Sequence, residues 1–346
     1  MDNNTNKKKR RFPIWATVLC IILAVILLIG VGVFAFIQIQ LSKINKYDPD
    51  DVVVVAPEDE SFETDDYKDG VEVVDPDDII WPDDIEWEED ENIVMSSADV
   101  TNILLIGQDT RIDGVRARSD SMMILTLNSK NKTIKVTSLM RDLYVQIPGY
   151  SDNRINAAYS FGGYPLLKST IEKNFGVRID YFVEVNFFAF TKIVDIVGGV
   201  YMDLNAAEAA YMKNLGHRTV EGRNRLDGDA ALCFCQMRYV GNSDYERTDR
   251  QRRTLNAIYQ ELRATASIST ILELVDEILP LVTTNMTNGE LISMATSLYT
   301  MNIGAVQQYR IPHDGAYTPM YVRGMAVLVP DLVVCREYLQ GIIYGE

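Results

Sequence analysis

The pattern of apolar and polar positions divides the chain into three parts. Residues 12–42 contain no charged side chain and consist mostly of Ile, Leu, Val, Ala and Phe. Residues 48–97 are acidic and contain several prolines. From about residue 98, short β-branched runs alternate with stretches whose apolar positions recur at helical spacing. This pattern predicts an α/β domain behind an apolar segment and a polar spacer.

The apolar segment is long enough to cross a bilayer, whose core needs about 20 apolar residues in a helix. The basic run at residues 7–11 lies just before it, so the tail at residues 1–11 is expected to stay in the cytoplasm. A cleavable signal peptide is the alternative, but its apolar region is shorter and ends at a small-residue cleavage site. We therefore predict an uncleaved, single-pass signal anchor over residues 12–42, with the remainder extracytoplasmic.

The acidic stretch accounts for most of the negative charge. Of the net charge of −16, residues 1–47 carry +6 and residues 48–91 carry −20, which leaves −2 for residues 92–346. Like charges repel and extend such a segment, so residues 43–97 are predicted to be a linker. Calcium binding or contact with a basic partner is the alternative, although no twelve-residue calcium loop is present. The acidic total argues against nucleic acid as a partner.

The remaining residues, 98–346, are predicted to form the catalytic α/β domain. Strands are predicted at residues 102–107, 122–127, 133–139, 181–187, 198–204 and 306–311. Helices are predicted at residues 165–174, 187–196, 227–235 and 248–264, with two more within 265–300 and one after Pro330. Residues 264–346 either complete this fold or form a small appended subdomain.

Charged side chains gather in two stretches of this domain, residues 102–141 and 238–253, which we expect to converge on one site. Asp109 and Asp120 flank one loop, and two carboxylates near phosphate oxygens are a usual way to hold Mg²⁺. Helix capping or simple solvation is the alternative for both. The arginines that could bind pyrophosphate in a bidentate manner are Arg118, Arg141, Arg238, Arg247 and Arg250. Taken singly, each could instead form a surface salt bridge.

Other catalytic signatures are absent from the sequence. There is no G-x-S-x-G motif and no Walker loop, and His217 and His313 lie outside both charged stretches. The four cysteines fit no zinc-binding pattern. Phosphoryl transfer is compatible with this set, because positioning and charge neutralisation carry most of its catalysis. The predicted helix start at Thr248 would also place the second arginine cluster near backbone N–H groups that favour anions.

An ordered series of motifs resembles the LytR-CpsA-Psr family. Over about residues 100–263 the series is NILLIGQDTR, RARSDSMMILTL, SLMRDLYVQIPG, RINAAYSFGG, VDIVGGV, LDGDAALCFCQMRY and DYERTDRQRR. The resemblance implies an α/β/α sandwich with a central mixed sheet, anchored by one membrane helix outside Gram-positive-type cells. It also implies Mg²⁺-assisted transfer of a glycopolymer, either teichoic acid or capsule-type polysaccharide, from an undecaprenyl-pyrophosphate carrier to peptidoglycan. The implied acceptor is the C6 hydroxyl of N-acetylmuramic acid.

The resemblance assigns roles residue by residue. Asp109 and Asp120 match the metal-proximal carboxylates. The catalytic set is Asp109, Arg118, Asp120, Arg141, Arg238 and Arg247. The pyrophosphate-binding set is Arg118, Arg141, Arg238, Asp244, Arg247, Arg250 and Gln251. Two positions depart from the family pattern: Met140 replaces the usual proline before Arg141, and Gln236 stands where many members have arginine.

The polyprenyl chain of such a substrate needs an apolar site. The candidates are Phe161, Phe175, Phe182, Val185, Phe187, Phe188 and Phe190, for which plain core packing is the alternative. Two other functions are compatible with the same residues. One is a pyrophosphatase that releases the lipid without an acceptor, and the other is a non-enzymatic envelope regulator or sensor.

Overall fold

The computed structural model describes residues 35–47, 79–87, 93–108, 119–241, 243–265, 273–274, 276–300 and 306–345. The chain divides into two units, Met1–Lys43 and Ile44–Glu346. In the first unit, residues 35–41 are helical. Within the described ranges no helix is both long and apolar enough to cross a membrane, and residues 12–34 of the predicted anchor lie outside those ranges.

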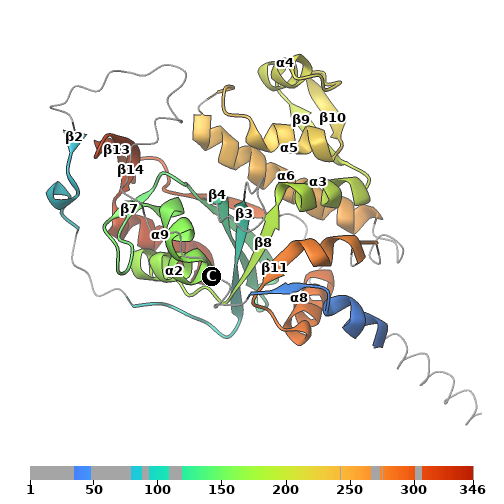
Figure 1. Ribbon diagram of the computed structural model, residues 1–346, viewed down its shortest axis with the longest axis horizontal. Helices are drawn as coiled ribbons and strands as arrows, with labels where there is room; N and C mark the ends of the chain where they lie inside the picture. The colour runs from blue at the N-terminus through green and yellow to red at the C-terminus, as the bar shows by residue number, and fades with distance from the viewer. Residues whose placement is uncertain are drawn as a thin grey trace, which may run out of the picture. The chain divides into compact units, whose positions relative to one another are not determined.

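A seven-stranded mixed sheet forms the centre of the second unit (Figure 1). In sheet order its strands are β1 (Asn45–Lys46), β11 (Val282–Thr284), β8 (Tyr181–Asn186), β3 (Val100–Gln108), β4 (Ser119–Asn128), β5 (Thr133–Leu139) and β12 (Gln307–Ile311). Strand β3 pairs in parallel with β8 and antiparallel with β4. The parallel pair matters for function because the ends of both strands meet at one edge of the sheet.

One face of the sheet is covered by α2 (Ile155–Phe175) and α9 (Leu332–Tyr344), which share the largest hydrophobic core with β3, β4 and β5. Phe182 lies in this core, fully buried and stacked on Tyr164 with 4.1 Å between the ring centroids. Helix α2 is interrupted at Gly162 and Gly163, and the φ of +60° at Gly163 is one that glycine adopts without steric cost.

The opposite face carries α3 (Phe187–Ile196), α5 (Gly228–Gln236) and α6 (Ser243–Thr265) (Figure 1). These helices enclose a second core together with α4 (Ala206–Asn214) and the hairpin of β9 (Val200–Leu204) and β10 (Gly222–Leu226). Side-chain caps fix where three of these helices begin, because Asn186, Asn205 and Asp227 each accept a hydrogen bond from a first-turn N–H.

The C-terminal residues contribute to the central sheet and also to a smaller one, in which β13 (Tyr317–Val322) pairs with β14 (Met325–Pro330) and with β2 (Ile79–Ile80). Strand β12 pairs in parallel with β5, and α9 packs into the main core. Helix α8 (Asn288–Thr300) packs near the sheet face that carries α6. The remaining elements are small: β2 (Ile79–Ile80), η4 (Pro82–Asp84), β6 (Tyr144–Val145), β7 (Asn153–Arg154), η5 (Leu279–Leu281), β13 (Tyr317–Val322) and β14 (Met325–Pro330).

The structure agrees with most of the predicted elements and corrects several. The strand at residues 133–139 and the helix at residues 187–196 have the predicted bounds. The helix predicted to begin at Thr248 begins at Ser243, so Arg247 lies inside the helix rather than ahead of its first N–H groups. The stretch 265–300, predicted to hold two helices, also contains a strand of the central sheet, β11. Helix α4 and the strands β10, β13 and β14 were not predicted.

Candidate active site

A β-bulge interrupts the pairing of strands β3 and β4 where β3 ends and β4 begins. Gly107 pairs with Ser121 and Gln108 pairs with Ser119, so Asp120 is the extra residue between the two pairs. Bulges redirect side chains and often border active sites. Asp109 follows β3 directly in the sequence, but Asp109 and Arg118 lie outside the described residues, as does the side chain of Asp120. Within the described part, no group of three or more His, Cys, Asp or Glu could hold a metal.

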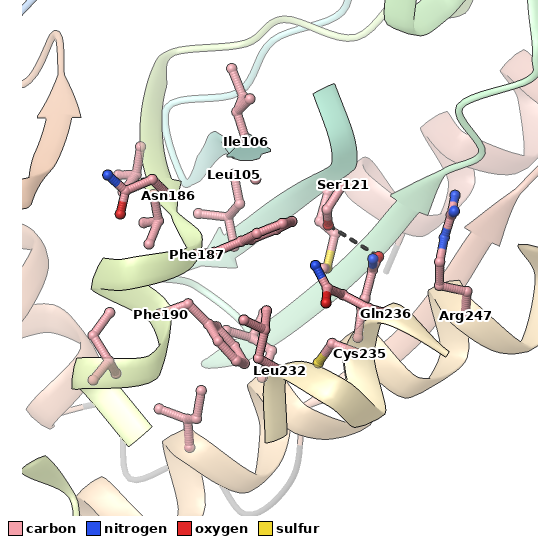
Figure 2. A pocket seen from close by; sticks show the side chains of 18 of the residues that line it. Leu105, Ile106, Ser121, Asn186, Phe187, Phe190, Leu232, Cys235, Gln236 and Arg247 are labelled. Atoms are coloured by element: carbon pink, nitrogen blue, oxygen red, sulfur yellow. Dashed lines mark hydrogen bonds between the residues drawn. The ribbon is translucent and has the colours of Figure 1, made fainter. Parts of the chain in front are cut away.

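A cavity of about 500 Å³ lies between this part of the sheet and helices α3, α5 and α6 (Figure 2). Its walls are mostly apolar. They are formed by Leu105, Ile106, Met123, Val183, Val185, Phe187, Phe190, Ile193, Leu232, Cys235, Leu255 and Ile258. Burial raises the pKa of the Cys235 thiol to about 12, so this group stays neutral and suits an apolar wall.

Polar side chains also line the cavity: Ser121, Asn186, Gln236, Arg238, Arg247 and Gln251. Figure 2 shows Arg247 well away from Phe190, whereas Asn186 lies on the same side as Phe187. The hydroxyl of Ser121 on β4 donates a hydrogen bond of 3.1 Å to Oε1 of Gln251 on α6. An apolar cavity that also contains guanidinium groups is suited to an amphiphile with an anionic head.

Ion pairs connect the two charged stretches directly. Nε of Arg141 donates a hydrogen bond of 3.0 Å to Asp244, and Nη1 of Arg247 lies 3.2 Å from the other oxygen of that carboxylate. Arg247 is only 3% exposed. The two stretches therefore converge as predicted. Asp244 contacts two arginines, which favours a role in orienting them over the direct contact with pyrophosphate predicted from the sequence, because a carboxylate repels an anion.

A second carboxylate extends this network. Asp142 lies 3.4 Å from Arg141 and 3.2 Å from Arg154. Burial raises the pKa of Asp142 to about 6, although the neighbouring arginines oppose that rise. Burial would also raise the pKa of Asp244, but the hydrogen bond with Asp142 and the charges of Arg141 and Arg247 lower it to about 2. Below about pH 6 the two carboxylates beside Arg141 therefore hold one proton, which lies on Asp142.

The raised pKa of Asp142 predicts a pH dependence of stability. This group stabilises the fold fully below the ordinary aspartate value of 3.8, and the contribution is lost as the pH rises through about 6. The lowered pKa of Asp244 has the opposite effect on stability: its contribution is lost as the pH falls from about 3.8 to about 2, below the pH range in which Asp142 titrates. From pH 4 to pH 6.5, wild type should lose urea stability relative to Asp142→Asn. Parallel curves for the two proteins would contradict the prediction, and the exposed Asp229→Asn serves as control.

Arg250 lies apart from the cavity. It is fully buried, and its guanidinium donates to Glu208 at 2.9 Å, to Glu246 at 2.7 Å and to the carbonyl oxygens of Met237 and Val240. Arg250 thereby connects three parts of the chain: helix α4, the segment that follows α5, and helix α6. It favours a structural role over the pyrophosphate contact predicted from the sequence.

We expect Arg250→Met to destabilise the fold by about 3–5 kcal/mol, because it removes the closest cation of the buried Glu208 and leaves only Arg253, at 3.6 Å. The measurement is urea unfolding followed by circular dichroism. Arg178→Met is a matched control, since Arg178 pairs with Asp180 while 58% exposed and should cost less than about 1 kcal/mol. If Arg250→Met kept the stability of wild type but lost pyrophosphate binding, Arg250 would be a ligand of the pyrophosphate after all.

Of the residues predicted to form the lipid site, some line the cavity and the others lie elsewhere. Val185, Phe187 and Phe190 line the cavity. Phe175 and Phe182 lie in the core on the opposite face of the sheet, Phe161 packs against that core, and Phe188 is 58% exposed. Leu255 and Ile258 could have been found from the sequence, because they occupy the inward positions of the amphipathic helix predicted there.

The fold and cavity define an α/β protein with a site for an amphiphilic anion. A model of the LytR-CpsA-Psr (LytR_cpsA_psr) family matches residues 77–331, and the chain belongs to this family.

Three relatives illustrate the similarity. The teichoic acid transferase TagU of Bacillus mycoides, whose full name is polyisoprenyl-teichoic acid–peptidoglycan teichoic acid transferase, is 36% identical over 227 residues, which cover 65% of this chain and 73% of TagU. The solved structure of TagT bound to LI-WTA is 26% identical with a TM-score of 0.59, over 71% of this chain and 92% of TagT. The crystal structure of B. subtilis TagV is 27% identical with a TM-score of 0.57, over 72% of this chain and all of TagV.

Proposed function

We propose that this chain is a phosphotransferase that attaches an anionic glycopolymer of the teichoic acid class to peptidoglycan, using a polyprenyl-pyrophosphate-linked donor. The observation that carries the proposal is the mostly apolar cavity that Arg238, Arg247 and Gln251 also line. The named activity of TagU and the ligand of TagT support the same substrate class.

The donor binds with its prenyl tail in the apolar part of the cavity and its pyrophosphate at the arginine end. Arg238 and Arg247 stabilise the charge that develops on the phosphate oxygens. Arg141 acts from the adjoining ion-pair network, where Asp244 orients it and Arg247 together. The burial of Arg247, which is 3% exposed, strengthens its interactions because little solvent screens them.

Mg²⁺ is part of the proposal because two carboxylates near phosphate oxygens are a usual way to hold it. Asp120 is the bulged residue at the start of β4, which pairs with the end of β3, and Asp109 is the next residue after β3 in the sequence. One of these carboxylates would hold the ion together with ligand phosphates and waters, which leaves the other available as a base, and the bound ion would neutralise phosphate charge.

The transfer itself forms one bond and breaks one. The C6 hydroxyl oxygen of an N-acetylmuramic acid residue attacks the glycan-side phosphorus, and the bridging P–O bond breaks. Undecaprenyl phosphate leaves and the glycopolymer becomes a phosphodiester of peptidoglycan. Asp109 or Asp120 accepts the hydroxyl proton, and the one that does so is not at that moment the metal ligand.

The location of the enzyme follows from the same proposal. Residues 12–42 anchor it in the cell membrane as a single span with the basic tail inside. The linker predicted at residues 43–97 is shorter than expected, because β1 (Asn45–Lys46) pairs with β11 and β2 (Ile79–Ile80) pairs with β13. The acidic spacer of the proposal is therefore residues 48–78. This arrangement would let the cavity take a lipid from the membrane and pass its glycan to the wall.

Product analysis tests the function. The full chain is incubated with a synthetic lipid-linked pyrophosphate sugar, a peptidoglycan oligomer and Mg²⁺, and the products are identified by mass. A sugar phosphodiester of peptidoglycan should appear in equal amount with prenyl phosphate. Prenyl phosphate with free sugar phosphate, formed equally with and without peptidoglycan, would instead identify a hydrolase.

A further inference from the structure

A second cavity, of about 320 Å³, lies on the other side of α6 from the active site. Arg247, Gln251, Leu255 and Ile258 face the active-site cavity, whereas Arg253, Asn256 and Gln260 face this groove. With 3.6 residues per turn, these two sets occupy opposite faces of the helix. The groove is completed by the β9–β10 hairpin and by Gln308 of β12. No catalytic residue lines it.

The exposed face of the hairpin carries an aromatic ring between arginines. Burial alternates along both strands, which leaves Tyr201, Asp203, Arg223 and Arg225 on the outer face. The guanidinium carbons of Arg223 and Arg225 lie 4.5 Å and 5.6 Å from the centre of the Tyr201 ring. Neither arginine forms an ion pair with a described residue, so both can meet an anion without breaking one.

Amide and carboxylate groups complete the groove. Oδ1 of Asn256 is buried there without a hydrogen-bond partner among the described residues. Asp203, Gln260 and Glu261 add further polar groups to the lining. An aromatic face with planar polar side chains around it is suited to sugar rings and their hydroxyls, and the free guanidinium groups are suited to phosphate.

We propose that this groove binds the phosphodiester-linked chain of the glycopolymer donor, beyond the units next to its pyrophosphate. The inference rests on the proposed function. Arg223 and Arg225 are two residues apart on one strand, about 7 Å, over which an extended polyol phosphate can place successive phosphates. Asn256 follows Arg247 by nine positions in α6, which is about 14 Å along the helix axis. A few repeat units of the polymer are therefore long enough to extend from the active site to the groove.

Binding of a soluble polymer tests this subsite without any turnover. The probe is a poly(glycerol phosphate) oligomer that lacks both lipid and pyrophosphate, and its affinity for the full chain is measured by calorimetry. The variant Tyr201→Ala/Arg223→Gln/Arg225→Gln should bind at least about tenfold more weakly than wild type, with an unchanged melting temperature. Arg178→Gln removes a matched exposed arginine outside the groove and should bind like wild type.

Equal affinity of wild type and the triple variant would overturn the proposal. It would also be overturned if a neutral chitooligosaccharide bound the groove better than the polymer does, which would assign it to peptidoglycan. A kinetic readout separates this subsite from the proposed function. With a donor that carries a single disaccharide the triple variant should match wild type, and with a long-polymer donor its KM should rise about tenfold. Inactivity of wild type on the short donor would count against the proposed function only.

Discussion

Replacing Arg247 with alanine is expected to lower kcat by about 10²–10³-fold, the loss typical of removing one charge-stabilising donor from a preorganised site. Arg247 lines the cavity, is almost fully buried and is held by Asp244, so its position is fixed before the substrate arrives. Single-turnover kinetics with a lipid-linked donor would measure the effect on the chemical step.

Two variants control this experiment. Arg247→Lys keeps the charge but loses the planar fork, so its kcat should fall between those of wild type and Arg247→Ala. Arg263→Ala removes an arginine of the same helix that stacks on Tyr259 outside the cavity, and its kcat should match wild type. A kcat for Arg247→Ala within about threefold of wild type, with the fold intact, would contradict the assigned site.

Filling the cavity should impair lipid binding in proportion to tail length. Leu255→Trp places an indole among the apolar walls, where it displaces methylene groups of a bound tail. Each lost buried methylene costs about 0.8 kcal/mol, so two already give more than a tenfold rise in KM. We expect that rise for an undecaprenyl donor and a much smaller one for a geranyl donor, measured by steady-state kinetics.

The volume-conserving variant Leu255→Met is the control and should behave like wild type with both donors. An equal rise in KM with the geranyl and undecaprenyl donors would show that the indole disturbs the arginine end instead. An unchanged KM with both donors would mean that the tail lies elsewhere.

Local pattern was sufficient to predict the central elements. The strand at residues 133–139 and the helix at residues 187–196 combine a clear period with boundary signals, such as the Asn186 cap. The hairpin of β13 and β14 was missed because Pro319 weakens the strand pattern, and because its turn uses Arg323 and Gly324 at positive φ instead of an Asn-Gly pair.

The site shows the same limit of sequence reasoning. Arg247 and Arg250 are three residues apart and look equivalent in the sequence, yet one lines the cavity and the other is enclosed by Glu208. Glu208 belongs to α4, which was not predicted although Asn205 and Glu208 have the spacing of a capping box. Without that helix, nothing in the sequence could separate a ligand-facing arginine from a structural one.

The prenyl tail of the donor should lie in the cavity behind Arg247. A polyprenyl pyrophosphate with a photoreactive diazirine near the tail end tests this, with labelled peptides of the full chain identified by mass spectrometry. We expect labels on β3, β8 and α6, at residues such as Leu105, Val183 and Ile258, that disappear when unlabelled undecaprenyl pyrophosphate competes. Labels confined to α9 or the β13–β14 hairpin would contradict it.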